Sequence, residues 1–310
     1  MIVLYAWGGA PVARSRPEAN QMSEAVDQDR RRQSALHWQS QAVLLAFVPV
    51  IAIWVTLVAG QMWIAHDPIV FWTAVISVGL TALVFVTRAA TPGAALTGGI
   101  ITAALYLQTP GLHTALWPLL ALLILTFGAT RFGRRHKETL GAAEARRGRN
   151  ASQVAANLGV AALAGIPLSA VHIFSPMSFN TRAALVAMIA AMAEATADTV
   201  SSELGQVLGG EPRLITTLLR VPAGTDGAIS LTGTLYGATA AAVVILVALV
   251  ALPLTRAQAL IAFAAGIAGL FIDTLLGALP ERRGWLNNDA VNALSTLAAA
   301  VLAAWAIRFA

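Results

Sequence analysis

The chain has 310 residues, of which 57% are hydrophobic and only 11% are charged. Soluble domains carry roughly 25% charged residues, so this composition disfavours a soluble enzyme, a disordered protein and a nucleic-acid-binding protein. In a membrane protein, a net charge of +5 reflects the Lys and Arg residues that set orientation, and no nucleic-acid partner is expected. The absence of cysteine excludes disulfides, thiolate catalysis and cysteine-ligated metals.

Residues 1–40 are polar and differ from the rest of the chain. Basic residues such as Arg14 and Arg30 are mixed with acidic residues such as Glu18 and Asp29. The short apolar opening precedes these charges, which is not the order of a signal peptide. We expect a mobile cytosolic leader, followed by a single integral membrane domain over residues 41–310.

Apolar runs of about the 20 residues needed to cross a bilayer recur from residue 41 onward. They lack the alternation of a transmembrane β-barrel strand. The sequence therefore predicts an all-α, polytopic transmembrane helical bundle with about nine spans, and eight to ten spans fit the pattern. The third run is short and contains glycine, so we expect it to be tilted or re-entrant. The runs are approximately 41–64, 68–87, 93–109, 113–130, 153–173, 183–200, 232–254, 257–279 and 289–308.

Basic residues predict the orientation of these spans. The break at 131–152 holds seven of the twenty Lys and Arg residues and should be cytoplasmic. Counting spans from this break places the N-terminus and the breaks at 201–231 and 280–288 on the same side. Polar residues gather at the cytoplasmic ends of the later spans, whereas the first four spans are nearly free of charge. We therefore predict that residues 41–130 form a scaffold and that residues 131–310 carry the active site.

The segment 146–157 begins the fifth run with polar residues. Arg146, Asn150, Gln153 and Asn157 share one helical face. One interpretation is a capped helix start whose amides bond to neighbouring helices. The other is a phosphate-facing surface, because a guanidinium group and the N-terminal amides of a helix both suit phosphate oxygens. Arg149 would join such a surface.

The segment AMAEATADTVSSELG, residues 191–205, puts carboxylates into an apolar helix. Glu194 and Asp198 are four residues apart and share a face with Ser201, whereas Glu203 points away if the helix continues. The insertion cost of an Asp at the centre of a membrane helix is about 2.5–3.5 kcal/mol. An Arg cluster, a proton or a divalent cation could balance these groups, and Mg²⁺ favours one or two carboxylates together with substrate phosphates. Buried ion pairs and a proton relay are the alternatives.

A glycine-rich segment follows at residues 212–234. Its core consists of Gly224, Thr225, Asp226 and Gly227. Glycine lets backbone amides approach an anion closely. No Gly-Lys-Ser/Thr sequence ends the segment, so it is not a Walker A loop.

Two further polar segments lie near the C-terminus. Asp273 lies on a helical face of small residues. A carboxylate there is costly unless it meets a metal, a base or a hydrogen-bond donor. The segment 285–295 places Asn288 and Asn292 on one face with Ser295. Helix capping explains one or two of its polar residues but not all of them.

The chain resembles the integral membrane family that contains the plant phytyl-phosphate kinase of vitamin E salvage. The resemblance spans residues 90–305 and rests on five segments in this order: RRGRNASQVAANLG, ADTVSSELG, PRLITTLLRVPAGTDGAISLTGT, GLFIDTLLGA and NNDAVNALS. This family is similar to the CTP-dependent polyprenol kinases. The resemblance therefore implies transfer of a nucleotide γ-phosphoryl group to an isoprenoid alcohol or an isoprenyl monophosphate such as phytyl phosphate. Asp226-Gly227-Ala228 stands where the family pattern has Asn-Gly-Gly, which leaves the choice between CTP and another nucleotide open.

The residues and the resemblance together define a candidate site. We expect catalytic roles for Glu194, Asp198 and Asp273. The candidate Mg²⁺ ligands are Asp198, Glu203, Asp273 and Asp289. The candidates for nucleotide or phosphate binding are Arg146, Arg149, Asn150, Asn157, Ser201, Ser202, Gly224, Thr225, Asp226, Gly227, Asn288 and Asn292.

The expected partners are an isoprenoid lipid, a nucleotide and the bilayer, and homo-oligomerisation stays open. A proton- or cation-coupled transporter is an alternative function, since intramembrane carboxylates and glycine-interrupted spans also suit transport. A non-catalytic membrane scaffold is a third.

Overall fold

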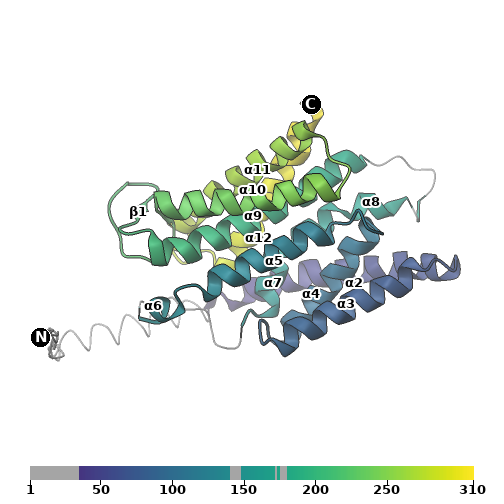
Figure 1. Ribbon diagram of the computed structural model, residues 1–310. Helices are drawn as coiled ribbons and strands as arrows, with labels where there is room; N and C mark the ends of the chain where they lie inside the picture. Colours follow the sequence, from purple (N-terminus) through teal and green to yellow (C-terminus); the bar gives the residue numbers. More distant parts are fainter. Residues whose placement is uncertain (1–34, 140–147, 172, 175–179) are drawn as a thin grey trace, which may run out of the picture.

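The computed structural model of the protein describes residues 35–139, 148–171, 173–174 and 180–310 (Figure 1). The candidate Arg146 and the first 34 residues of the predicted leader lie outside this part of the chain. The described residues form a helical bundle with one pair of two-residue strands. The protein is therefore an all-α polytopic membrane protein, as the apolar runs predict.

Each of the nine predicted runs contains a helix. The helices are α2 (His37–Ile64), α3 (Ile69–Val86), α4 (Pro92–Gln108), α5 (Leu116–Arg131), α6 (Arg134–Thr139), α7 (Ala151–Ala164), α8 (Ile166–Ala170), α9 (Thr181–Leu208), α10 (Leu231–Ala251), α11 (Arg256–Leu276) and α12 (Asn288–Ala306). A π-helical turn η1 (Gly277–Glu281) follows α11, and a 3₁₀ turn η2 (Ile307–Phe309) follows α12. The antiparallel strands are β1 (Arg213–Leu214) and β2 (Ala228–Ile229).

Six described helices are long and apolar enough to cross a membrane, namely α2, α3, α9, α10, α11 and α12. The helices α5 and α7 are apolar but shorter. The fifth predicted run is not one continuous span, because it divides into α7 and α8 at Gly165. Pro167 lies in the first turn of α8, where its missing N–H is tolerated although it could not continue α7.

Helix α9 is the centre of the bundle. Its side chains are almost all buried from Ala184 to Val200. It packs against α5, α7, α10, α11 and α12. Figure 1 shows α9 running between α10 on one side and α5 on the other. A polar side chain on α9 is therefore held away from lipid.

Polar N-caps start several helices of the bundle. At each of these positions the side chain accepts a hydrogen bond from a backbone N–H of the first turn, which satisfies an otherwise unpaired donor. These residues are Thr91 for α4, Asn150 for α7, Ser230 for α10, Thr255 for α11 and Asn287 for α12.

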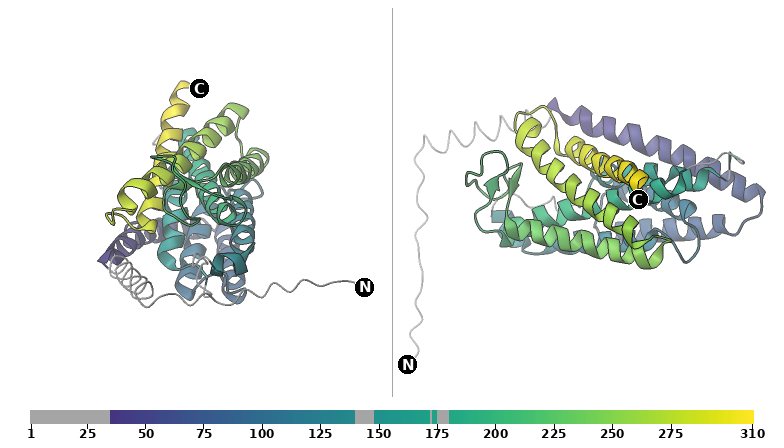
Figure 2. Two further views of the ribbon diagram at one scale, coloured as in Figure 1. Left: turned by 90° about the vertical axis from the view of Figure 1, so that its left-hand side faces the viewer. Right: turned by 90° about the horizontal axis from the view of Figure 1, so that it is seen from above.

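Contacts between distant segments bring most of the polar breaks together at one end of the bundle. The backbone N–H of Thr91 donates to the carbonyl of Arg149 at 3.0 Å. Gln39 at the start of α2 donates to the carbonyl of Trp285, before α12, at 2.8 Å. Figure 2, left, looks onto this end, where the strands β1 and β2 also lie. Its cytoplasmic location is the prediction made from the basic residues.

Candidate active site

Three carboxylates lie between the central helix and α11. Glu194 on α9 is only 1% exposed, and neither of its carboxylate oxygens has a hydrogen-bond partner among the described residues. Asp198, one turn further along α9, interacts electrostatically with Glu194 and with Asp273 on α11. The structure thus brings together the three residues expected to be catalytic.

Polar side chains of α12 and α7 extend this cluster. The hydroxyl of Ser295 donates to a carboxylate oxygen of Asp273 at 3.1 Å and lies beside Glu194 as well. One turn before Ser295, Asn292 donates to the side-chain oxygen of Asn157 on α7 at 3.4 Å. Both Asn residues are buried, so the polar row reaches from the carboxylates across the interior to α7.

Arg149 provides positive charge at this site. Asp198 interacts electrostatically with it. The backbone around Arg149 is fixed, because its N–H donates to the carbonyl of Ala89 at 3.3 Å and its carbonyl accepts from Thr91. Gly148 has a φ of +75°, and a Cβ at this position would overlap the backbone of Ala89. The close approach of these two segments therefore requires glycine.

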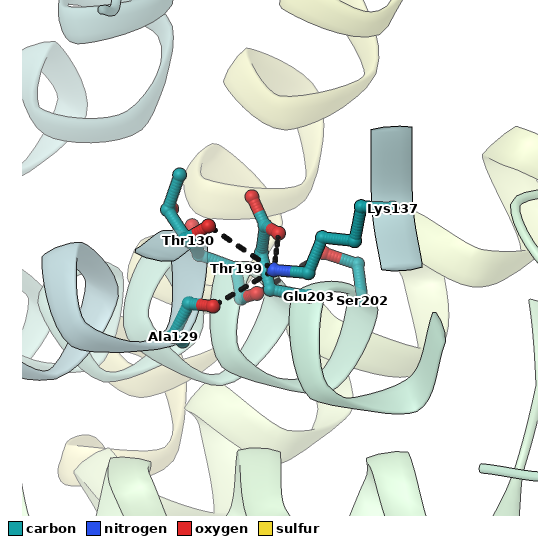
Figure 3. Close-up of polar contacts among 6 residues, drawn as sticks. All are labelled: Ala129, Thr130, Lys137, Thr199, Ser202 and Glu203. Atoms are coloured by element: carbon teal, nitrogen blue, oxygen red, sulfur yellow. Dashed lines mark hydrogen bonds and ion pairs between the residues drawn. The ribbon is translucent and has the colours of Figure 1, made fainter. Parts of the chain in front are cut away.

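Glu203 faces a different partner (Figure 3). Helix α9 continues to Leu208, and Glu203 accepts a hydrogen bond of 2.5 Å from the ammonium group of Lys137 on α6. Lys137 is 1% exposed and also donates to the carbonyls of Ala129 and Thr130, at 2.8 and 3.2 Å. The ammonium group thus satisfies carbonyls at the end of α5 and ties that end to α9. Glu203 points away from Glu194, as predicted for a continuing helix.

The start of α7 is organised as a cap. Asn150 accepts from the backbone N–H of Gln153, and the Gln153 side chain accepts from the backbone N–H of Asn150. This capping box is the contact pattern that the capping interpretation predicts. The adjacent Ser152 donates to Asp289 of α12 at 2.6 Å, so Asp289 joins the start of α12 to the start of α7.

The glycine-rich loop packs onto the turn after α11. Gly224 and Gly227 have φ values of +84° and +71°. A Cβ at Gly227 would overlap the backbone of Ala278 in η1, so only glycine fits there. Within the loop, the N–H of Thr225 donates to Pro222 and that of Ala228 donates to Thr225. Asp226 is exposed, and it interacts electrostatically with Glu281.

Three other predicted residues lie nearby without joining the carboxylates. Ser201 packs against Gly237 of α10, because α10 and not α11 lies against this last part of α9. Ser202 is exposed and donates to the carbonyl of Thr199 at 3.1 Å. Asn288 is exposed in the first turn of α12. Phosphate binding by these residues stays a prediction.

Glu281 was not among the predicted site residues. It ends η1 close enough to both Asp226 and Asp198 for like-charge repulsion, so it lies between the glycine-rich loop and the carboxylates. The π-helical hydrogen bond from Arg282 to Gly277 brings it into this position. Such turns are frequent at functional sites. Glu281 lies in a break next to two arginines, where helical periodicity gives no signal.

The carboxylates fit Mg²⁺ in its usual protein setting. The described residues contain no group of three or more His, Asp or Glu side chains arranged as a ready-made metal site. However, Mg²⁺ is usually held by one or two carboxylates and by substrate phosphates. Asp198 and Asp273 supply such a pair, and the buried carboxyl group of Glu194, whose oxygens have no hydrogen-bond partner among the described residues, lies beside them. Glu203 and Asp289, in contrast, already have protein partners.

The fold and this site define a polytopic helical membrane protein with an acidic centre enclosed by its helices. The profile of the integral membrane protein family DUF92 matches residues 75–300, and the chain belongs to this family. The matched region contains all three carboxylates, the glycine-rich loop and Arg149. It also contains most of the first four spans, beginning within α3.

Three relatives match part of the chain. An uncharacterized membrane protein of Methanocaldococcus jannaschii is 43% identical over 124 residues, which are 40% of this chain and 52% of that protein. An uncharacterized membrane protein of Synechocystis is 31% identical over 186 residues, 59% of this chain and 70% of the relative. The chloroplastic protein VTE6 of Arabidopsis thaliana is 30% identical over 186 residues, 59% of this chain and 55% of the relative. No solved structure matches the chain.

Proposed function

We propose that the protein is a membrane-embedded lipid kinase that transfers the γ-phosphoryl group of a nucleoside triphosphate, CTP in the first instance, to an isoprenoid alcohol or isoprenyl monophosphate. One observation carries this proposal. Glu194, Asp198 and Asp273 converge inside an apolar bundle next to Arg149. Buried carboxylates are costly without a balancing cation, and phosphoryl transfer uses carboxylates, cations and Arg together.

The sequence resemblance supports this class of reaction. The resemblance is to a family that contains a phytyl-phosphate kinase and is similar to CTP-dependent polyprenol kinases. The segments that carry it include ADTVSSELG with Asp198 and GLFIDTLLGA with Asp273. A lipid acceptor also accounts for a kinase within the membrane, because an isoprenoid chain partitions into the bilayer and presents its polar head at the interface.

Asp198 and Asp273 would hold Mg²⁺ together with the nucleotide phosphates. When bound, Mg²⁺ neutralises charge on the phosphates during transfer. Arg149 would contact the transferred phosphoryl group and stabilise its developing charge. The backbone of the loop Gly224–Gly227 would hold the other phosphates, and Asn292 and Asn157 would orient the acceptor head group.

In the reaction, an acceptor oxygen forms a bond to the γ-phosphorus while the bond from that phosphorus to the β–γ bridging oxygen breaks. A nucleoside diphosphate leaves. With an alcohol acceptor, Glu194 would take the hydroxyl proton, and the product is a lipid monophosphate. With a monophosphate acceptor, the attacking oxygen needs no deprotonation by the protein, and the product is a lipid diphosphate.

The test is transfer of label by the purified protein. The assay combines γ-labelled CTP or ATP, Mg²⁺ and a panel of isoprenyl alcohols and monophosphates, and it follows labelled lipid. We expect product with wild type, none in excess EDTA, and recovery when Mg²⁺ is restored. Asp198→Asn should lower the rate about a hundredfold or more with expression unchanged. Glu138→Gln, on the exposed face of α6, is the control and should keep full activity.

Two results would contradict the proposal. Full activity of Asp198→Asn would show that the carboxylate of Asp198 is not needed for the reaction. Proton-coupled solute uptake into liposomes, with no labelled product from any acceptor, would favour a transporter instead.

A further inference from the structure

A cavity of about 500 Å³ lies between α3, α4, α5 and α7. Its walls are mainly apolar and include Leu80, Val84, Leu119, Leu123 and Leu158. Pockets that bind small molecules typically measure about 300–1,000 Å³, so this cavity is large enough to hold a substantial ligand. It lies largely within the four spans that the sequence predicts to be a scaffold.

Arginines line one end of this cavity. Arg88 follows α3, Arg131 ends α5, and Arg149 precedes α7. All three lie at the end of the bundle where the polar breaks meet. The apolar walls and this positive end are complementary to a lipid with one anionic head group.

The positive end of the cavity meets the carboxylate site. Arg149 lines the cavity and interacts electrostatically with Asp198. Asn157 also lines the cavity, and its side chain accepts a hydrogen bond from Asn292. A head group held at this end would therefore lie next to the residues proposed to transfer the phosphoryl group.

Two residues at this end have unusual surroundings. Thr130 lines the cavity, and its buried hydroxyl has no hydrogen-bond partner among the described residues. Arg88 has a φ of +53° at the position after α3 that usually holds glycine, because glycine adopts this left-handed backbone without strain. Arg88 therefore occupies a backbone position that favours glycine.

The cavity is accessible from the side of the bundle. Leu83 on α3 and Leu120 and Ile124 on α5 line it, yet they are 58%, 43% and 63% exposed. In a membrane these side chains would face lipid. A chain dissolved in the bilayer could enter between α3 and α5 without leaving the hydrocarbon region.

We infer that this cavity binds the acceptor of the proposed kinase, a single-chain isoprenyl monophosphate, with its chain against α3, α4 and α5 and its phosphate at Arg88, Arg131 and Arg149. The inference rests on the proposed function, because phosphorylation of the bound lipid requires the kinase activity. Binding of the lipid can be measured without turnover. It assigns α3, α4 and α5, three of the first four spans, a role in substrate binding.

Gly98 on α4 provides a direct test. It lines the cavity, and a Cβ added there meets no atom within 4 Å, so a larger side chain would extend into open space. Gly98→Leu should therefore fold and fill part of the cavity. Gly79→Leu is the matched control: Gly79 is also helical and has open space around it, but it lies on α3 outside the cavity lining.

The binding experiment uses the purified full chain in detergent and a diazirine-bearing C20 isoprenyl monophosphate as the probe. Cross-linked peptides are mapped by mass spectrometry, with and without a tenfold excess of phosphatidic acid. We expect cross-links in α3, α4 or α5 that phosphatidic acid does not displace. Gly98→Leu should weaken labelling about tenfold or more, because blocking burial of two methylene groups is sufficient for this factor, and Gly79→Leu should label as wild type does.

Other results overturn the inference. Cross-links confined to the outer faces of α10–α12 would exclude the cavity, and displacement by phosphatidic acid would assign it to a bilayer phospholipid. If Gly98→Leu does not fold, Arg88→Gly serves as the second variant: weaker labelling supports the inference, and unchanged labelling opposes it. Cross-linking in the cavity without labelled product from wild type in the kinase assay would leave the binding site intact and contradict only the proposed function.

Discussion

Gly269 on α11 packs directly against the side chain of Glu194 on α9. A Cβ built on Gly269 would lie 2.5 Å from Cγ of Glu194 and 2.9 Å from Cβ of Ala299 on α12. Three helices thus meet at a position that only glycine can occupy without movement. Because Gly269 has no side chain, the side chain of Glu194 can occupy the space between α9 and α11.

Gly269→Ala should therefore disturb both packing and activity. Overpacking a well-packed interior costs about 1–3 kcal/mol of unfolding free energy, and the added methyl group would displace Glu194. We expect a lower thermal midpoint together with reduced phosphoryl transfer. Gly60→Ala on α2, where a Cβ meets nothing within 4 Å, should leave the midpoint unchanged or raise it. Full activity of Gly269→Ala would show that the position of Glu194 is not critical.

Glu194→Gln separates the chemical role of this carboxylate from its packing. The amide has nearly the same shape, and it replaces a buried carboxyl group whose oxygens have no hydrogen-bond partner among the described residues. Stability should stay the same or rise, while transfer to an alcohol acceptor should fall about a hundredfold or more. Thermal unfolding in detergent and the label-transfer assay measure the two effects. Lower stability with normal turnover would assign Glu194 a structural role.

The apolar runs predicted the helices well because length and hydrophobicity alone determine which segments can cross a bilayer. The carboxylates were also predictable, since Glu194, Asp198 and Asp273 interrupt apolar helices where charge is costly. Ser201 packs against Gly237 of α10, and helical periodicity does not show which neighbouring helix covers this last part of α9.

The cavity and its arginines could not be predicted in the same way. Arg88 is a single basic residue in a short break, and its proximity to Arg149 comes from a backbone contact between segments about 60 residues apart in sequence. The apolar lining looks like any membrane helix until the helices are packed. The sequence of spans that are nearly free of charge therefore looks the same whether they form only a scaffold or also enclose a ligand.

The ion pair between Lys137 and Glu203 should contribute to stability. Removing one partner of a buried pair leaves an uncompensated charge, which costs about 3–5 kcal/mol of unfolding free energy. We expect Lys137→Met to lower the thermal midpoint strongly and the double variant Lys137→Met with Glu203→Leu to recover much of the loss. Arg134→Gln breaks a pair whose side chains are each 40% exposed, so it should cost at most about 1 kcal/mol.

Activity of the double variant tests the metal role predicted for Glu203. If Glu203 serves only to pair with Lys137, phosphoryl transfer should return together with stability. A stable but inactive double variant would instead indicate that Glu203 takes part in the reaction. Measuring the Mg²⁺ concentration needed for half-maximal rate distinguishes a lost metal ligand from a general loss of turnover.

Arg88→Gly should raise stability and lower activity at the same time. The N–H groups of Arg88 and Ala89 donate to Phe85 and Val84, which closes the end of α3 in the pattern that favours glycine after a helix. Relieving the left-handed backbone of Arg88 should stabilise the protein by about 1 kcal/mol, whereas losing the guanidinium should raise KM for a monophosphate acceptor. If Arg88 had only a structural role, its replacement would not raise stability and lower activity at the same time. An alcohol acceptor carries no charge for Arg88 to bind, so its KM should change far less; equal changes in KM for both acceptors would contradict a phosphate contact.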